Sequence, residues 1–476
     1  MRAWAQLAAA LALLAAPACA QDITLTGAMT GADHQTYREV PFRVPEGVTS
    51  VTVDFDYTGR DQKSVIDLGL RDPVRFRGWS GGNKASFTLT ETWATPSYLP
   101  GPLPAGEWKL ILGVPNLRKD ARADYTAKIT FGRGAVFHGF AAAPLKAGPG
   151  WYRGDLHLHT GHSDGSCPSK TGKRTPCPLF LTLAAAEARG LDFVAVTEHN
   201  TSSHIQDLAE LQGYFDDLLL IPGREVTTFK GHANVFGMTG PLDFQLGSPR
   251  APGLGAILDE VEAAHALISI NHPALPSGEA CMGCGWTATT DYARIPSMEA
   301  INGMISSGPL SGVGFWEKRL DDGFHITAVG GSDNHDATLP PDRGVGRPTT
   351  VVHAQALSQD AVLAAIRAGH VFVDALGTRD RLLEVTANAG GATAEMGDRL
   401  PDAAGATLRI HVAHAAGGRL AFAGPAAAGL DPGPPLSDAE TRAMGVPAGA
   451  KGWLRVDVRG PDGALWLLGN PIWFGS

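Results

Sequence analysis

The stretch Asp155-Leu156-His157-Leu158-His159 carries the first strong indication of fold and chemistry in this chain. It reads as the end of a β-strand, in which residues i and i+2 share a face, so His157 and His159 point the same way. Two imidazoles on one face suit a single bound cation. A His-x-His pair alone is a weak signal, so its weight depends on the residues around it in the fold.

Similar residues recur after later apolar strands. They are Thr197-Glu198-His199-Asn200, Gly223-Arg224-Glu225, Ile270-Asn271-His272-Pro273 and Gly331-Ser332-Asp333-Asn334-His335, with Asp164 in a turn and His232 opening a further strand. A lone His or Glu at a strand end is ordinarily a surface or capping residue. Repeated occurrence is harder to dismiss, because burying so many polar groups without cations is costly.

The segment 150–376 that carries these residues alternates short apolar strands with Ala-rich helical stretches. Repeated β/α units predict a parallel sheet or barrel that is buried on both faces. In barrels of this kind the chemistry lies at the carboxyl ends of the strands. We therefore expect the recurring residues to gather at one end of the segment.

As an ordered set, these motifs resemble the PHP superfamily, named for polymerase and histidinol phosphatase domains. The resemblance covers slightly under half of the chain. With its export signal and flanking β segments, the whole architecture is similar to the CehA/McbA-like branch, which includes carbaryl hydrolases. The resemblance implies a distorted (β/α)7 barrel with a trinuclear metal site. Glu198 departs from the pattern, in which Asp is common before the histidine, but it is not a ligand.

The resemblance also implies a role for each ligand. The first cation is held by His157, His159 and Asp333, and Glu225 bridges it to the second. The second is completed by His232 and His272, and the third is held by Asp164, His199 and His335. His162 lies close to Asp164 in the sequence and is an alternative ligand for the third cation.

Such a site predicts hydrolysis. Two adjoining cations lower the pKa of a shared water, and imidazole with carboxylate suits two to three Zn, Mn or Fe ions. Around this site His204 is a candidate general acid, with a helix-start or solvent role as the favoured alternative, and Glu225 is the bridging catalytic carboxylate. Asp155 and Asn271 are candidate partners of the ligands, with ordinary backbone capping as the alternative. Arg343 and Arg347 are candidates for clamping an anionic substrate, with a plain surface role as the alternative.

The flanking segments differ in character from the middle one. Residues 1–20 read as a signal peptide, with Arg2, an apolar run and Ala18-Cys19-Ala20 before the cleavage point, which predicts a periplasmic or extracellular protein. Residues 22–145 predict a β-sandwich, and 380–476 a small C-terminal β domain. Aromatic residues of the sandwich offer a possible glycan contact face or core packing (Trp79, Trp93 and Tyr98).

The composition argues against some classes of protein, namely nucleic-acid-binding and membrane-spanning ones. The formal net charge is −9, and no Lys/Arg-rich block indicates a nucleic-acid-binding surface. After the signal, no stretch reaches the ~18 apolar residues of a membrane span. Four cysteines remain, and by proximity we favour Cys167 with Cys177 and Cys281 with Cys284; the alternative is a thiolate zinc site.

The leading hypothesis is hydrolysis of a small anionic phosphoester. A carbamate or aryl-ester hydrolase with the same site is the alternative, and an amidohydrolase barrel ranks third, because it would not supply Asp164 and His199. A different class is a non-catalytic surface or glycan-binding protein. A barrel that had lost its catalytic activity should also have lost metal ligands, but all nine of the expected ligand positions carry a suitable residue.

Overall fold

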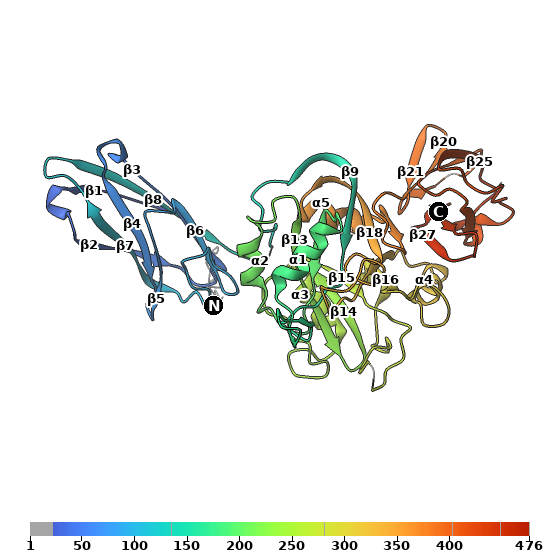
Figure 1. Cartoon of the computed structure of the whole chain (residues 1–476), viewed down its shortest axis with the longest axis horizontal. Helices are drawn as coiled ribbons and strands as arrows, with labels where there is room; N and C mark the ends of the chain where they lie inside the picture. Colours follow the sequence, from blue (N-terminus) through green and yellow to red (C-terminus); the bar gives the residue numbers. More distant parts are fainter. Residues whose placement is uncertain (1–21, 135, 280, 402, 448, 476) are drawn as a thin grey trace, which may run out of the picture. The chain divides into compact units, whose positions relative to one another are not determined.

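The computed structural model describes residues 22–134, 136–279, 281–401, 403–447 and 449–475. The expected signal peptide, 1–20, lies outside the described residues. The chain divides after Gly134 into two compact units, shown in blue and in green to red in Figure 1. Among the described residues, no helix is long and apolar enough to cross a membrane.

The first unit is a β-sandwich. Two antiparallel four-stranded sheets, ordered β1-β8-β3-β6 and β2-β7-β4-β5, share one hydrophobic core. Their strands are β1 (Ile23–Thr30), β2 (Tyr37–Val44), β3 (Ser50–Tyr57), β4 (Val65–Arg71), β5 (Phe76–Gly81), β6 (Ser86–Thr90), β7 (Gly106–Asn116) and β8 (Arg122–Gly132), with short 3-10 helices at Gly31–Asp33 and Arg60–Gln62. In β8, buried and exposed residues alternate almost without break, as expected for a strand with one face on the core.

Core packing explains one of the sandwich aromatics: Tyr98 is buried and stacks on Phe87 with ring centroids 3.8 Å apart. Trp79 is half-buried and packs edge-on against the exposed Tyr37. Glycan contact by this unit remains a prediction.

The second unit is built on one long sheet. Its first nine strands run in the order β17-β16-β15-β14-β13-β12-β9-β18-β19. They are β9 (Lys146–Asp155), β12 (Phe193–Val196), β13 (Leu219–Thr228), β14 (Gly231–Phe236), β15 (Leu267–Ile270), β16 (Ser297–Asn302), β17 (Thr327–Gly331), β18 (Thr349–Leu357) and β19 (Val371–Asp374). The pairs β9–β12, β12–β13, β15–β16 and β16–β17 are parallel.

The segments that follow two strands far apart in this order meet. A bridge joins Leu158, just after β9, to Asn334, just after β17, and the N–H of His159 donates to the carbonyl of Asn334 at 2.9 Å. The segments that follow β9 and β17 are therefore neighbours, although five strands separate β9 from β17 in the sheet order. This contact places the first and last sequence motifs side by side.

A regular (β/α)7 alternation is not seen in the described residues. They contain five α-helices: α1 (Leu179–Ala188), α2 (Ile205–Leu211), α3 (Leu254–Ala263), α4 (Gly312–Asp321) and α5 (Gln359–Ala368). The sheet also contains antiparallel neighbours, β13–β14, β14–β15, β9–β18 and β18–β19. The turn between β13 and β14 contains no helix, whereas α3 lies between β14 and β15 and α5 lies between β18 and β19. The antiparallel pairing of these neighbours is therefore what departs from a regular parallel barrel.

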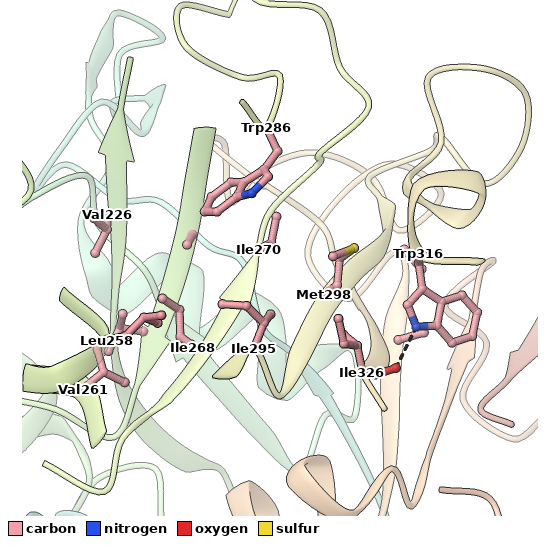
Figure 2. Close-up of a cluster of buried hydrophobic side chains, with 14 of the residues drawn as sticks. Val226, Leu258, Val261, Ile268, Ile270, Trp286, Ile295, Met298, Trp316 and Ile326 are labelled. Atoms are coloured by element: carbon pink, nitrogen blue, oxygen red, sulfur yellow. Dashed lines mark hydrogen bonds between the residues drawn. The ribbon is translucent and has the colours of Figure 1, made fainter. Parts of the chain in front are cut away.

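One large apolar cluster supports the strands that carry the site. Figure 2 shows Val226 of β13, Leu258 of α3 and Ile270 of β15 in this cluster. Trp316 of α4 is fully buried, and its indole N–H donates to the carbonyl of Ile326 at 2.7 Å (Figure 2).

The C-terminal strands are divided between a separate sheet and the central sheet. A four-stranded antiparallel sheet is formed by β20 (Leu382–Ala389), β21 (Ala392–Glu395), β23 (Thr407–Ala413) and β25 (Ala439–Gly445). The remaining strands continue the central sheet, because β27 pairs with β19; they are β22 (Arg399–Leu400), β24 (Arg419–Ala423), β26 (Gly452–Arg459), β27 (Leu465–Gly469) and β28 (Ile472–Phe474). Further 3-10 helices lie at Tyr292–Arg294 and Pro425–Ala427.

The four cysteines form the two expected pairs. Cys167 and Cys177 lie on the small hairpin β10 (Ser166–Pro168) and β11 (Arg174–Pro176) or beside it, with Cα atoms 4.9 Å apart. Cys281 and Cys284 have Cα atoms 5.6 Å apart. Both separations suit disulfides.

Candidate metal centre

Three histidine and carboxylate groups lie together at the carboxyl ends of the central strands. The first contains the pair that follows β9. The Nε2 atoms of His157 and His159 lie 3.4 and 3.2 Å from Oδ1 of Asp333, which follows β17. Both imidazoles are buried. The side chains at the end of β9 therefore converge on the carboxylate of Asp333, which follows His157 by 176 residues and His159 by 174 residues.

Glu225 on β13 lies at the centre of the cluster. Its Oε1 is 3.5 Å from His157 Nε2, 3.3 Å from His232 Nδ1 and 3.4 Å from His272 Nε2. Its Oε2 is 2.7 Å from His199 Nδ1. The carboxylate is fully buried, so burial would raise its pKa, but the imidazoles around it, His157 foremost, hold that pKa well below the usual range.

The third group is the most open. Nε2 of His335 lies 3.3 Å from Asp164 Oδ1, and Nε2 of His199 lies 3.6 Å from Asp164 Oδ2. The side chain of Asp164 is 58% exposed, whereas that of Glu225 is 1% exposed. The His335 imidazole lowers the pKa of Asp164 to about 2. Burial alone would lower the pKa of His335, but Asp164 and Asp333 outweigh it and raise that pKa to about 9.

In three of the histidines, one ring nitrogen donates a hydrogen bond and the other faces a carboxylate. His157 Nδ1 donates to Glu299 Oε1 at 3.0 Å, His232 Nε2 to the Met282 carbonyl at 3.1 Å, and His335 Nδ1 to the Asp333 carbonyl at 2.9 Å. Since these acceptors cannot donate, the opposite nitrogen carries the lone pair whenever the imidazole is neutral. Histidine ligands of metals are commonly oriented by such a hydrogen bond.

The residues present fit divalent cations. His157 Nε2 and both ring nitrogens of His159 are buried and have no hydrogen-bond partner among the described residues. Leaving such atoms unpaired is costly. The N···O separations of 3.2 to 3.6 Å in the first two groups match the roughly 3.3 Å expected between tetrahedral ligands at about 2.0–2.1 Å from one ion.

Backbone strain accompanies the cluster. His272 and Asp333, at the ends of β15 and β17, have φ angles of 26° and 52°. Non-glycine residues in this region cost free energy and persist where the surroundings hold them. The N–H of His272 donates to Glu299 Oε2 at 2.9 Å, which is one such constraint.

Glu299 was not among the residues predicted from the sequence. It is buried in β16, accepts from His157 with Oε1, and accepts from Asn302 Nδ2 at 3.0 Å with Oε2. A charged residue inside the apolar strand Ser297–Asn302 was the available signal.

The two predicted supporting residues contact the cluster in different ways. Asn271 donates from Nδ2 to Glu225 Oε1 at 3.0 Å. Asp155 contacts no ligand side chain in the described structure; instead it accepts the backbone N–H groups of His157, Ser332 and Gly346 at 3.2, 3.0 and 2.7 Å. It thereby fixes the backbone that carries His157 and Asp333.

His204 lies in an environment that does not suit a general acid. It is fully buried, its Nε2 donates to the Gly223 carbonyl at 3.0 Å, and burial lowers its pKa to about 4. His162, the alternative third-group ligand, turns away from Asp164. Its Nδ1 lies 2.9 Å from Ser203 Oγ and its Nε2 lies 3.1 Å from Asp207 Oδ2.

The two arginines are not brought to the ligands. Arg347 donates to the carbonyl of Asp342, Arg343 is exposed, and neither makes an ion pair with a site carboxylate among the described residues. A role for them in binding substrate is still untested.

No family model matches the chain, and no curated protein matches it. Among solved structures, it is 20% identical to a two-domain protein from Bacteroides vulgatus that contains a predicted PHP-like metal-dependent phosphoesterase; the match covers 71% of this chain and 99% of that one, with a TM-score of 0.38. It is 17% identical to PliG of Salmonella Typhimurium, a periplasmic inhibitor of g-type lysozyme, over 23% of this chain and 87% of that one, with a TM-score of 0.14. At these TM-scores neither likeness establishes fold or activity.

Proposed function

We propose that the chain is a metal-dependent phosphoesterase of the PHP type, with the CehA/McbA-like branch as its closer placement, and that the strands from β9 to β19 are a rearranged form of the PHP barrel. The observation that carries the proposal is the Glu225 carboxylate, which faces imidazoles with both of its oxygens inside a buried cluster. Ordinary packing does not need such an arrangement, whereas adjoining cations do.

The groups define which residues would hold two to three Zn, Mn or Fe ions. His157, His159 and Asp333 would hold the first and His232 and His272 the second, with Glu225 shared between them; Asp164, His199 and His335 would hold the third. Bound cations of this kind supply Lewis acidity and a hydroxide nucleophile near neutral pH. The protein contributes the orientation of each ligand, through Glu299, Asn271 and the Met282 carbonyl.

Exposure of the third group favours an anionic substrate. Asp164, His199 and His335 reach solvent, whereas His157, His159 and Glu225 are buried. A cation at the exposed end would face the substrate oxygens and stabilise the negative charge that develops in the transition state. A phosphoester carries such oxygens, which favours it over a neutral carbamate.

We assign proton delivery to the leaving group to His162. Its ring is partly exposed and lies between Ser203 and Asp207, so the Asp207 carboxylate accepts from Nε2 and fixes the ring. The turn that carries His162 is anchored because Glu198 Oε1 accepts the N–H of Thr160 at 2.9 Å. The same turn carries Asp164, two residues later in the chain, and this closeness in sequence to the third group supports the assignment.

We also propose that the protein is exported. The support is the signal-like sequence of residues 1–20 together with two cysteine pairs at disulfide distance. Disulfides of this kind persist in oxidising compartments.

The test is a side-by-side assay of the metal-loaded protein on p-nitrophenyl phosphate, bis-p-nitrophenyl phosphate and 1-naphthyl N-methylcarbamate. Phosphoester turnover that is lost in His157→Ala is the expected result. Turnover of the carbamate alone would replace the proposal with an ester or carbamate hydrolase. No turnover with any metal would favour a binding protein.

A further inference from the structure

The buried sulfur of Cys284 lies against two ligands of the second group. Its Sγ and one ring nitrogen each of His232 and His272 all lie within 4.8 Å of one another. Cys284 is 0% exposed, while its partner Cys281 is partly exposed. One half of a disulfide therefore adjoins the candidate metal centre and the other half reaches solvent.

The fold holds Cys284 at this place. Gly283 has φ +84° and packs so closely on the Thr228–Phe229 turn that a Cβ would lie 2.2 Å from the Thr228 carbonyl oxygen. On the other side, Trp286 is buried in the core near Ile270 (Figure 2). Anchors on both sides mean that breaking the disulfide would not carry Cys284 far from the two imidazoles.

The same loop orients one of those imidazoles. The carbonyl of Met282, between the two cysteines, accepts from His232 Nε2 at 3.1 Å and leaves Nδ1 facing Glu225. The Cys-x-x-Cys loop thus already acts on the second group while its cysteines are joined.

We propose that reduction of the Cys281–Cys284 disulfide makes Cys284 a thiolate ligand of the cation held by His232 and His272, and thereby switches the site off. This inference rests on the proposed function. Zinc sites with an open position are catalytic, whereas sites whose four positions are filled by protein ligands are structural. The Cys284 thiolate would add a third protein ligand to the cation beside His232 and His272 and occupy a position that catalysis needs open.

The redox step balances with a dithiol as the reductant. The dithiol supplies two electrons and two protons, the Cys281–Cys284 bond breaks, and the reductant forms its own disulfide. Cys281 becomes a thiol, and Cys284 loses its proton to solvent on binding the cation. Oxidation by a disulfide reverses the change and reopens the position.

The other disulfide is a control within the same chain. Cys167 and Cys177 are likewise buried, but they belong to none of the groups of metal-binding residues among the described side chains. Removing this pair should leave the response at Cys284 intact.

The test uses the full chain loaded with Co²⁺, because cobalt bound to a thiolate has a near-ultraviolet charge-transfer absorption. Protein is reduced with a dithiol, freed of it without oxygen, and titrated with Co²⁺, alongside Cys281→Ser, Cys284→Ser and the Cys167→Ser/Cys177→Ser variant. The thiolate band is expected in the reduced wild type, in reduced Cys167→Ser/Cys177→Ser, and in Cys281→Ser without reductant. It should be absent from the oxidised wild type and from Cys284→Ser. Phosphoester turnover should fall by at least about 10-fold wherever the band appears.

Two results would overturn the inference. Cobalt bound with its visible bands but without the thiolate band, in both reduced wild type and Cys281→Ser, would show that Cys284 is not a ligand, and the proposed function would stand. No cobalt binding in any form would overturn the inference and the proposed function together.

Discussion

Glu299 and Glu225 contact opposite nitrogens of the same imidazole: His157 Nδ1 lies 3.0 Å from Glu299 Oε1, and His157 Nε2 lies 3.5 Å from Glu225 Oε1. Glu299 thereby fixes the tautomer that leaves Nε2 available for a cation. We predict that Glu299→Gln weakens metal binding by roughly 10- to 100-fold. Competition with a chelator measures the effect. Glu260→Gln, on the exposed face of α3, is the control, and equal affinities in the two variants would contradict the assigned role.

Two substitutions, His162→Ala and His204→Ala, distinguish between the two candidate general acids. His162→Ala should lower kcat by about 100-fold at unchanged metal content, because it removes the proton donor. His204→Ala should instead lower Tm, since it leaves a cavity and removes the donor to the Gly223 carbonyl, while kcat of the folded enzyme stays near the wild-type value. The opposite pattern would indicate that His204, and not His162, is the general acid.

Asp155 is predicted to act through the backbone. Asn has only one acceptor oxygen, and its NH₂ group would face backbone donors that Asp155 now satisfies. Asp155→Asn should therefore lower the free energy of unfolding by about 2 kcal/mol, measured by denaturant titration of the metal-free protein. The exposed Asp438→Asn should change it by less than about 0.5 kcal/mol. A similarly small change in the free energy of unfolding for both variants would contradict the role of Asp155 in holding the backbone.

His370 gives the second unit a pH-dependent contribution to stability. Its Nε2 lies 3.2 Å from Asp398 Oδ1 and its Nδ1 3.5 Å from Glu395 Oε1, and the hydrogen bond to Asp398 is the main cause that raises the pKa of His370. A raised folded pKa means that the stability is present below the unfolded pKa of about 6.5 and is lost as pH rises through the folded pKa.

We therefore expect the free energy of unfolding of the wild type to exceed that of His370→Gln by about 1 kcal/mol near pH 5.5. The difference should shrink as the pH rises above the folded pKa of His370. Urea unfolding in the presence of a chelator makes the comparison without metal. A difference that grows with pH would contradict the sign.

The sequence predicted the strand-end residues because their signal is local. A ligand type directly after an apolar strand is visible in a few residues, and parallel strands bring those ends together, as His157 and Asp333 show. The sandwich strands were equally visible from alternation, for example in β3.

What sequence reasoning missed depends on distant partners. Glu299 lies inside β16, and its partner His157 is 142 residues away, so the local signal, a charge inside an apolar strand, did not reveal what it contacts. The pairing of β27 with β19, which joins the C-terminal strands to the central sheet, is likewise long-range. The position of His204 was visible, but its burial against Gly223 was not.

The central claim is that the histidine and carboxylate cluster binds metal, and equilibrium binding stoichiometry tests it most directly. The metal-free protein, titrated with Zn²⁺ or Mn²⁺ in the calorimeter, should bind two to three equivalents. Glu225→Gln should weaken binding of at least two of them, because its carboxylate is shared. Zero equivalents bound by the folded wild type, or unchanged binding in Glu225→Gln, would contradict the account.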